Sequence, residues 1–194
     1  MKKIALLSLL SLAMAACGEK KSAERTDLKV DTRNMYFGGD FIYFADAAVF
    51  SDCATGARYN VSRNDVYLQV EKKYSSFKFT NHETISLDVL GYLVPKSAAE
   101  EGHPYTLVMT EVLEIDPGLE CDEASIKTGH YVMGNDTLSV AADYTWSKGG
   151  KQGVWGMLDA EEMFLIAADT SRAHIDLWSN DLIFDEQTRY VKQN

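Results

Sequence analysis

Three cysteines and four histidines are the residues of this sequence best suited to metal or nucleophilic chemistry. Metal sites and redox-active cysteine pairs need these side chains at short, regular spacings. No cysteine pair here has the CxxC spacing, no histidine pair has the HxxxH spacing, and no hydrolase or phosphate-loop motif occurs. We therefore predict that the chain is not an enzyme and that it holds no metal ion and no cofactor.

Cys17 ends a short segment that is typical of an export signal. Two lysines begin the segment, an apolar run follows, and two alanines precede the cysteine. A positive start, a short apolar core and a small-residue exit describe a cleaved signal peptide, and the run is too short to span a bilayer. Because Met14 to Cys17 resembles the bacterial lipobox, we predict a lipoprotein signal peptide over residues 1–16 and acylation, including palmitate, of Cys17. The alternative is an ordinary secretory signal.

Residues 17–34 are predicted to be a flexible tether. The first part of this stretch is polar, and it contains too little apolar surface to fold. No aspartate directly follows Cys17, which by the sorting rule of enteric-type bacteria indicates the outer membrane. The expected location is therefore the bacterial outer membrane, through a lipid anchor, facing either the periplasm or the cell surface.

Cys53 and Cys121 remain once Cys17 is assigned to the anchor. In an oxidising compartment, two cysteines most simply form one disulfide. The alternative is a pair of free thiols that bind copper.

The acidic composition excludes one class of partner. The chain carries 29 acidic against 19 basic side chains, a formal net charge of −10. Loss of Lys2 and Lys3 with the signal would make that charge more negative still. An acidic surface repels phosphate backbones, so we predict no nucleic-acid partner.

The periodicity of apolar residues predicts an all-β fold with one short helix. Strands are expected from Met35 through the apolar run at 41–45 and again over 85–94 and 105–115. Between them, Tyr67, Val70, Tyr74 and Phe77 recur at helical spacing, after a capping residue at position 64 or 65. We interpret this aromatic stripe as core packing.

The last third of the sequence predicts a meander of hairpins. Apolar residues alternate with polar or small ones from Leu138 to Trp146. Short strands are then expected over 154–158, 163–168, 173–178 and 182–184, about ten residues apart.

Two motifs resemble a known family. Residues 40–56 read DFIYFADAAVFSDCATG, and residues 113–121 read LEIDPGLEC. They resemble the opening and the close of the C-terminal OB-fold domain of the NlpE outer-membrane lipoproteins. The resemblance covers about residues 35–121 and implies an OB-fold barrel in which Cys53 pairs with Cys121. Asp46 and Asp52 lie in the first motif, and we interpret them as structural turn residues or, alternatively, as partner-facing carboxylates.

The sequence departs from the family pattern at both ends of this segment. Full-length members carry a barrel with a CxxC motif before the OB domain, and here only the tether precedes residue 35. The copper association of the family is linked partly to that motif and is not carried over. Residues 122–194 are expected to form a β-rich region, either a half-barrel or a second small domain.

These observations favour a non-enzymatic envelope lipoprotein. The resemblance implies a role in envelope-stress sensing or surface adhesion through contacts with an envelope protein partner. The alternative function is a lipoprotein that handles copper or another metal.

Overall fold

The computed structural model describes most of the chain after the first 31 residues. Cys17, the signal segment, Asp46 and His82 lie outside the described residues. The described ranges are 32–44, 47–79, 83–96, 103–118, 121–122, 125–168, 170–177 and 179–193.

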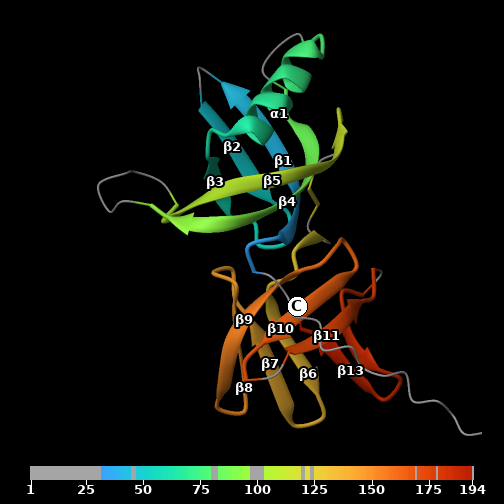
Figure 1. Ribbon diagram of the computed structural model, residues 1–194. Helices are drawn as coiled ribbons and strands as arrows, with labels where there is room; N and C mark the ends of the chain where they lie inside the picture. Colours follow the sequence, from blue (N-terminus) through green and yellow to red (C-terminus); the bar gives the residue numbers. More distant parts are fainter. Residues whose placement is uncertain are drawn as a thin grey trace, which may run out of the picture.

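The chain folds into two closed β-barrels, one above the other in Figure 1. The first barrel has strand order β1-β2-β3-β5-β4 and closes through the pairing of β4 with β1. Only the contact between β3 and β5 is parallel, which is the order and direction of an OB fold. Its elements are β1 (Met35–Phe44), β2 (Ala47–Asp52), β3 (Arg58–Val61), α1 (Asp65–Ser76), β4 (Ile85–Pro95) and β5 (Tyr105–Asp116).

The second barrel is an eight-stranded meander. Each strand pairs antiparallel with the next, and the barrel closes where Val191 and Lys192 pair with Val132 and Tyr131. Among the described residues, every strand of this barrel therefore has a hydrogen-bonded neighbour on both sides. Its strands are β6 (Gly129–Met133), β7 (Asp136–Val140), β8 (Thr145–Lys148), β9 (Lys151–Met157), β10 (Glu162–Ile166), β11 (Thr170–Ile175), β12 (Leu182–Asp185) and β13 (Thr188–Lys192).

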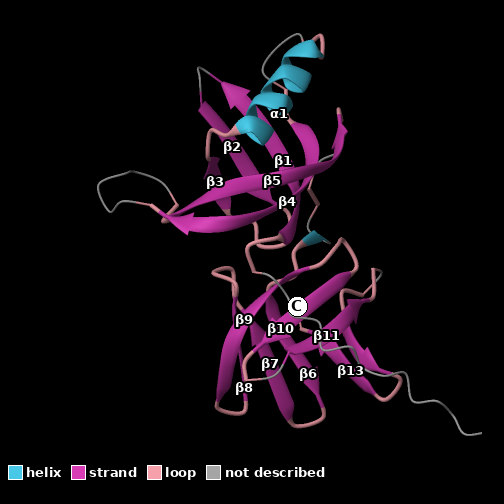
Figure 2. Ribbon diagram, viewed as in Figure 1, coloured by secondary structure: helices cyan, strands magenta, loops and turns pink. Residues whose placement is uncertain are grey.

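The prediction of an all-β fold with one short helix, an OB-like barrel and then a meander is confirmed (Figure 2). Helix α1 begins after Asn64, whose Oδ1 accepts a hydrogen bond from the Tyr67 amide at 2.8 Å. Tyr67, Val70 and Tyr74 are buried, as their spacing predicts. The Asn64 side chain also donates to the Met109 carbonyl of β5 at 2.7 Å, which fixes the helix to the barrel.

Strand β1 pairs with a neighbour on each side and so closes the first barrel. Its first half pairs with β4 and its second half with β2. Gly39 makes this close pairing possible, since a Cβ there would lie 2.2 Å from the Ser51 carbonyl oxygen. Gly39 is therefore a packing requirement of the barrel.

Each barrel has its own buried core. Aromatic residues supply the largest buried side chains in both. In the first barrel they are Phe37, Phe41, Phe50 and Tyr59, and in the second Tyr131, Trp155, Phe164 and Tyr190.

The structure differs from the sequence pattern at one point of the meander. The alternation from Leu138 to Trp146 is not one strand, because β7 ends at Val140 and β8 begins at Thr145. Asp143 stabilises the intervening turn by accepting hydrogen bonds from the amide and hydroxyl of Thr145 at 3.0 and 2.6 Å. Tyr144 has a φ of 62°, which no strand residue adopts. Strands β6 and β13 were also not predicted from the sequence.

Candidate functional site

The loop that follows β2 carries the residues of the first motif toward the second barrel. Cys53 in this loop forms a disulfide with Cys121, 68 residues later, with their Cα atoms 5.2 Å apart. The Cys121 amide also donates to the Asp40 carboxylate at 3.2 Å. The disulfide therefore fixes the loop to the segment where the chain leaves the first barrel.

Asp52 lies at the centre of this junction and is 1% exposed. Its carboxylate accepts hydrogen bonds from the Ala54 amide at 3.1 Å and from the Thr55 hydroxyl. Tyr144 of the second barrel donates its hydroxyl proton to Oδ2 of Asp52 at 2.6 Å. Asp52 is thus both a turn carboxylate within its own loop and the acceptor of a hydrogen bond that joins the barrels.

The electrostatics of this pair follow from burial. Burial raises the pKa of Asp52 above 3.8, although the Thr55 and Tyr144 hydroxyls oppose that rise. Burial, reinforced by the nearby Asp52 charge, raises the pKa of Tyr144 well above 10. Tyr144 is therefore a permanent donor at neutral pH.

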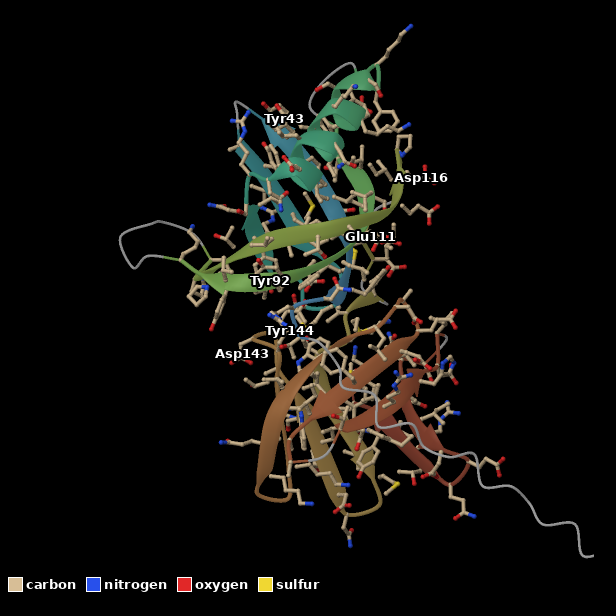
Figure 3. All side chains as sticks on the ribbon, viewed as in Figure 1. Tyr43, Tyr92, Glu111, Asp116, Asp143 and Tyr144 are labelled. Atoms are coloured by element: carbon tan, nitrogen blue, oxygen red, sulfur yellow. A yellow bond between two sulfur atoms is a disulfide. The ribbon has the colours of Figure 1, made fainter. Side chains whose placement is uncertain are left out.

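The Tyr144 side chain lies between the two barrels and is 6% exposed. Its ring makes an edge contact with Phe37 of the first barrel, with ring centres 5.9 Å apart, and lies 4.8 Å from the Trp155 ring. A positive φ at an aromatic residue costs of order 1–3 kcal/mol and persists where surrounding contacts enforce it. Here the Asp52 hydrogen bond and the two aromatic rings hold the side chain in place. Figure 3 shows Tyr144 at the boundary between the two barrels.

Backbone contacts complete the junction. Tyr36 of β1 pairs with Met157 of β9, which joins the two barrels into one continuous sheet. The Lys127 amide, just before β6, donates to the Ala54 carbonyl at 2.7 Å. The loop after β2 is therefore hydrogen-bonded to the second barrel through Asp52 and to the segment before β6 through Ala54.

A hollow of about 270 Å³ lies beside this junction, with walls that include Tyr59, His103, Tyr105 and Trp155. His103 packs edge-on against Tyr59, with ring centres 4.6 Å apart. The Tyr59 hydroxyl is buried and has no hydrogen-bond partner within the described residues. Burial, and then the Asp52 charge, raises its pKa to about 12.

No catalytic or metal constellation emerges from the residues that the sequence singled out. In the described part of the chain, no three His, Cys, Asp or Glu side chains are placed to hold a metal ion. His103 lies at the junction, whereas His130 bonds Ser139 at 2.9 Å on the surface. No described helix is both long and apolar enough to cross a membrane.

Sequence reasoning identified Asp52 and the cysteines but not Tyr144. The tyrosine lies within an alternating apolar pattern, so it looked like an ordinary strand residue. The available signal was the Asp143 side chain, which caps the turn of residue 144 from within an otherwise strand-like run.

Comparison with known proteins assigns the first barrel. The family model described as "NlpE C-terminal OB domain" matches residues 31–122. The curated "Lipoprotein NlpE" of Escherichia coli K12 is 37% identical over 84 residues, which cover 43% of this chain and 30% of that protein. The chain therefore spans under a third of this relative's length.

A solved structure described as "Crystal structure of the Cpx pathway activator NlpE from Escherichia coli" is also similar, with 21% identity and a TM-score of 0.38. That similarity covers 62% of this chain and 54% of the solved one. The second barrel lies outside the residues that the family model matches. The five-stranded barrel with its disulfide loop, formed within residues 31–122, matches the NlpE C-terminal OB domain in both sequence and strand order.

Proposed function

We propose that this protein is a non-enzymatic envelope lipoprotein that signals envelope stress through contacts of its OB barrel with an envelope protein. The observation that carries the proposal is the match of residues 31–122 to the NlpE C-terminal OB domain. The E. coli relative is named a lipoprotein, and the solved E. coli NlpE is described as an activator of the Cpx pathway. OB folds serve many functions, so the partner must be tested directly.

The partner contact belongs to the part of the OB barrel that the second barrel leaves open. The loop after β2 already contacts Tyr144 and the segment before β6, so it is covered by the second barrel. Helix α1 packs on the barrel through its apolar stripe, so its polar face is turned outward. Strand β5 offers a further exposed surface, on which Leu113 is 49% exposed.

A Cpx reporter in E. coli tests the signalling proposal. Overproduction of the full chain is expected to raise reporter activity several-fold. The control is residues 1–34 fused to an unrelated globular domain and produced at the same level, because it retains the proposed anchor and the load on export. Equal responses to the chain and to the fusion would contradict the proposal.

Two matched surface variants assign the response to one barrel. Leu113→Glu adds a charge at a 49% exposed position of the OB barrel, and Val191→Glu does so at a 47% exposed position of the second barrel. We expect Leu113→Glu to lower the reporter response and Val191→Glu to leave it unchanged. The reverse pattern would assign signalling to the second barrel.

The lipid anchor at Cys17 is proposed from the sequence pattern and has its own test. Cys17→Ser removes the thiol that would carry the diacylglycerol. We expect the wild-type chain to take up labelled palmitate and to fractionate with outer membranes, and the variant to do neither. Palmitate uptake by Cys17→Ser would refute acylation at this residue.

A further inference from the structure

The second barrel is hollow at the end opposite the junction. Its wall at this end is formed by the β8–β9, β10–β11 and β12–β13 hairpins, which lie far from the OB barrel in Figure 1. The hollow has a volume of about 590 Å³. Eight-stranded barrels are wide enough to hold one small ligand, and small-molecule sites span roughly 300–1,000 Å³.

The floor and one wall of this hollow are apolar and well fixed. Leu138 and Leu165 form its deep part and are 2% and 4% exposed. Phe184 contributes a half-buried ring. The indole of Trp146 is held in place because its N–H donates to the Ile166 carbonyl at 3.2 Å. This lining suits an aliphatic chain.

The rim of the hollow is basic. Lys148 and Lys151 both line it and pair directly across the β8–β9 hairpin. Like charges in directly opposite positions destabilise a hairpin, so a bound anion between them would relieve the repulsion. Lys148 forms an ion pair with Asp136 at 3.3 Å, whereas Lys151 has no ion-pair partner within the described ranges.

The acidic side chain on the same rim is turned to its own hairpin. The Asp185 carboxylate accepts hydrogen bonds from the Gln187 amide at 2.9 Å and the Thr188 hydroxyl at 3.0 Å. Its charge is therefore partly satisfied within the β12–β13 turn. Lys148 also donates to the Tyr190 hydroxyl, so Lys151 is the main cation that can receive an anionic ligand, with the Lys148 ammonium as the second positive charge beside it.

We propose that this end of the second barrel binds the anion of a medium-chain fatty acid. The hydrocarbon tail lies among Leu138, Trp146, Leu165 and Phe184, and the carboxylate lies between Lys148 and Lys151. The proposal concerns a different barrel from the one assigned to stress signalling, so either can fail without the other.

Calorimetric titration with dodecanoate tests the proposal on the chain produced without residues 1–17, which retains every described residue. Dodecanol and dodecyltrimethylammonium, which share the tail, test the need for a negative head group. We expect one dodecanoate per chain, with both analogues binding at least tenfold more weakly. No binding of dodecanoate, or equal binding of all three, would overturn the proposal.

Three variants locate the site. Lys148→Met with Lys151→Met is expected to weaken dodecanoate binding at least tenfold, and Ala168→Trp to abolish it by filling the mouth of the hollow. Lys72→Met with Lys78→Met makes the same charge change at exposed positions of the OB barrel and should leave binding unchanged. Near-ultraviolet circular dichroism establishes that each variant is folded. Wild-type affinity in both the rim and the mouth variants would place the ligand elsewhere and refute the site.

Discussion

The two barrels solve the same packing problem in different ways. Both barrels bury aromatic rings, but the OB barrel has only five strands, a helix against its wall and a disulfide. The second barrel has eight short strands, contains neither cysteine of the disulfide, and leaves a hollow of about 590 Å³ at one end. Strand number sets barrel width, so a narrow barrel fills with its own side chains and a wider one leaves room. The filled barrel suits a rigid surface, and the hollow barrel suits a ligand.

Removal of the disulfide should have the largest effect on stability, and it should destabilise the OB barrel more than the second barrel. A cross-link over a 68-residue loop is worth about 4 kcal/mol in the chain-entropy account. Cys53→Ser with Cys121→Ser should therefore lower the free energy of unfolding of the OB barrel by about that amount. Trp146 lines the hollow at the far end of the second barrel, so the fluorescence of a variant that keeps Trp146 and has phenylalanine at positions 155 and 178 reports on the second barrel. An equal shift in the tryptophan signal and in the far-ultraviolet circular dichroism would show that the barrels unfold together.

A pair of phenylalanine truncations should measure the difference in packing. Phe50 of the OB barrel is 0% exposed, whereas Phe184 lines the hollow and is half-buried. Truncating a fully buried ring costs about 3–5 kcal/mol, and the cost falls where the site is already open. We expect Phe50→Ala to destabilise the protein by about 2–3 kcal/mol more than Phe184→Ala in denaturant titrations. Equal losses would mean that the second barrel is as tightly packed as the first.

Tyr144→Phe should weaken the connection between the barrels. It removes one donor to the buried Asp52 carboxylate while keeping the ring contacts with Phe37 and Trp155. We expect the free energy of unfolding to fall by about 1.5 kcal/mol, the lower end of the range for a hydrogen bond to a charged group. Tyr131→Phe removes a hydrogen bond to the Lys127 carbonyl without touching Asp52 and serves as the control. A larger loss from the control would show that the Asp52 contact contributes little.

The pH dependence of Asp52 should give the smallest effect. Because burial raises its pKa in the folded state, the folded protein holds this proton more tightly than the unfolded chain. Its contribution to stability is complete below pH 3.8 and is lost as pH rises through the folded pKa. Melting temperatures should show Asp52→Asn gaining on the wild type with rising pH, by less than about 1.4 kcal/mol per pH unit, the limit for one proton. Parallel profiles would contradict the assignment.

Local sequence patterns predicted the elements whose surroundings are simple. Helix α1 has its cap and its buried stripe where Asn64, Tyr67 and Tyr74 indicate. Strands β4 and β5 form where the alternation over 85–94 and 105–115 predicts them, although their pairing carries register shifts on both sides of Glu111. In these places one periodicity, or one break in it, is enough to determine the local structure.

The apolar periodicity of the sequence was insufficient where contacts between distant residues determine the backbone conformation. Tyr144 combines a positive φ with a hydroxyl that donates to Asp52, 92 residues earlier, and no local pattern indicates that contact. Strand β13 pairs with β6, about 60 residues away, and neither has a strong alternation of its own. The hollow could not be foreseen either, because it depends on the strand number of a barrel whose closing strands were not recognised.

The entry point of the chain has a mechanical consequence. Strand β1 starts at the junction between the barrels (Figure 1). There Tyr36 pairs with Met157, and the Met35 side chain lies against Gly156. The anchor at Cys17 proposed above would therefore hold the molecule at the junction of its two barrels. Held there, the molecule would keep the far ends of both barrels away from the membrane. The helix end of one barrel and the open mouth of the other can then be approached at the same time.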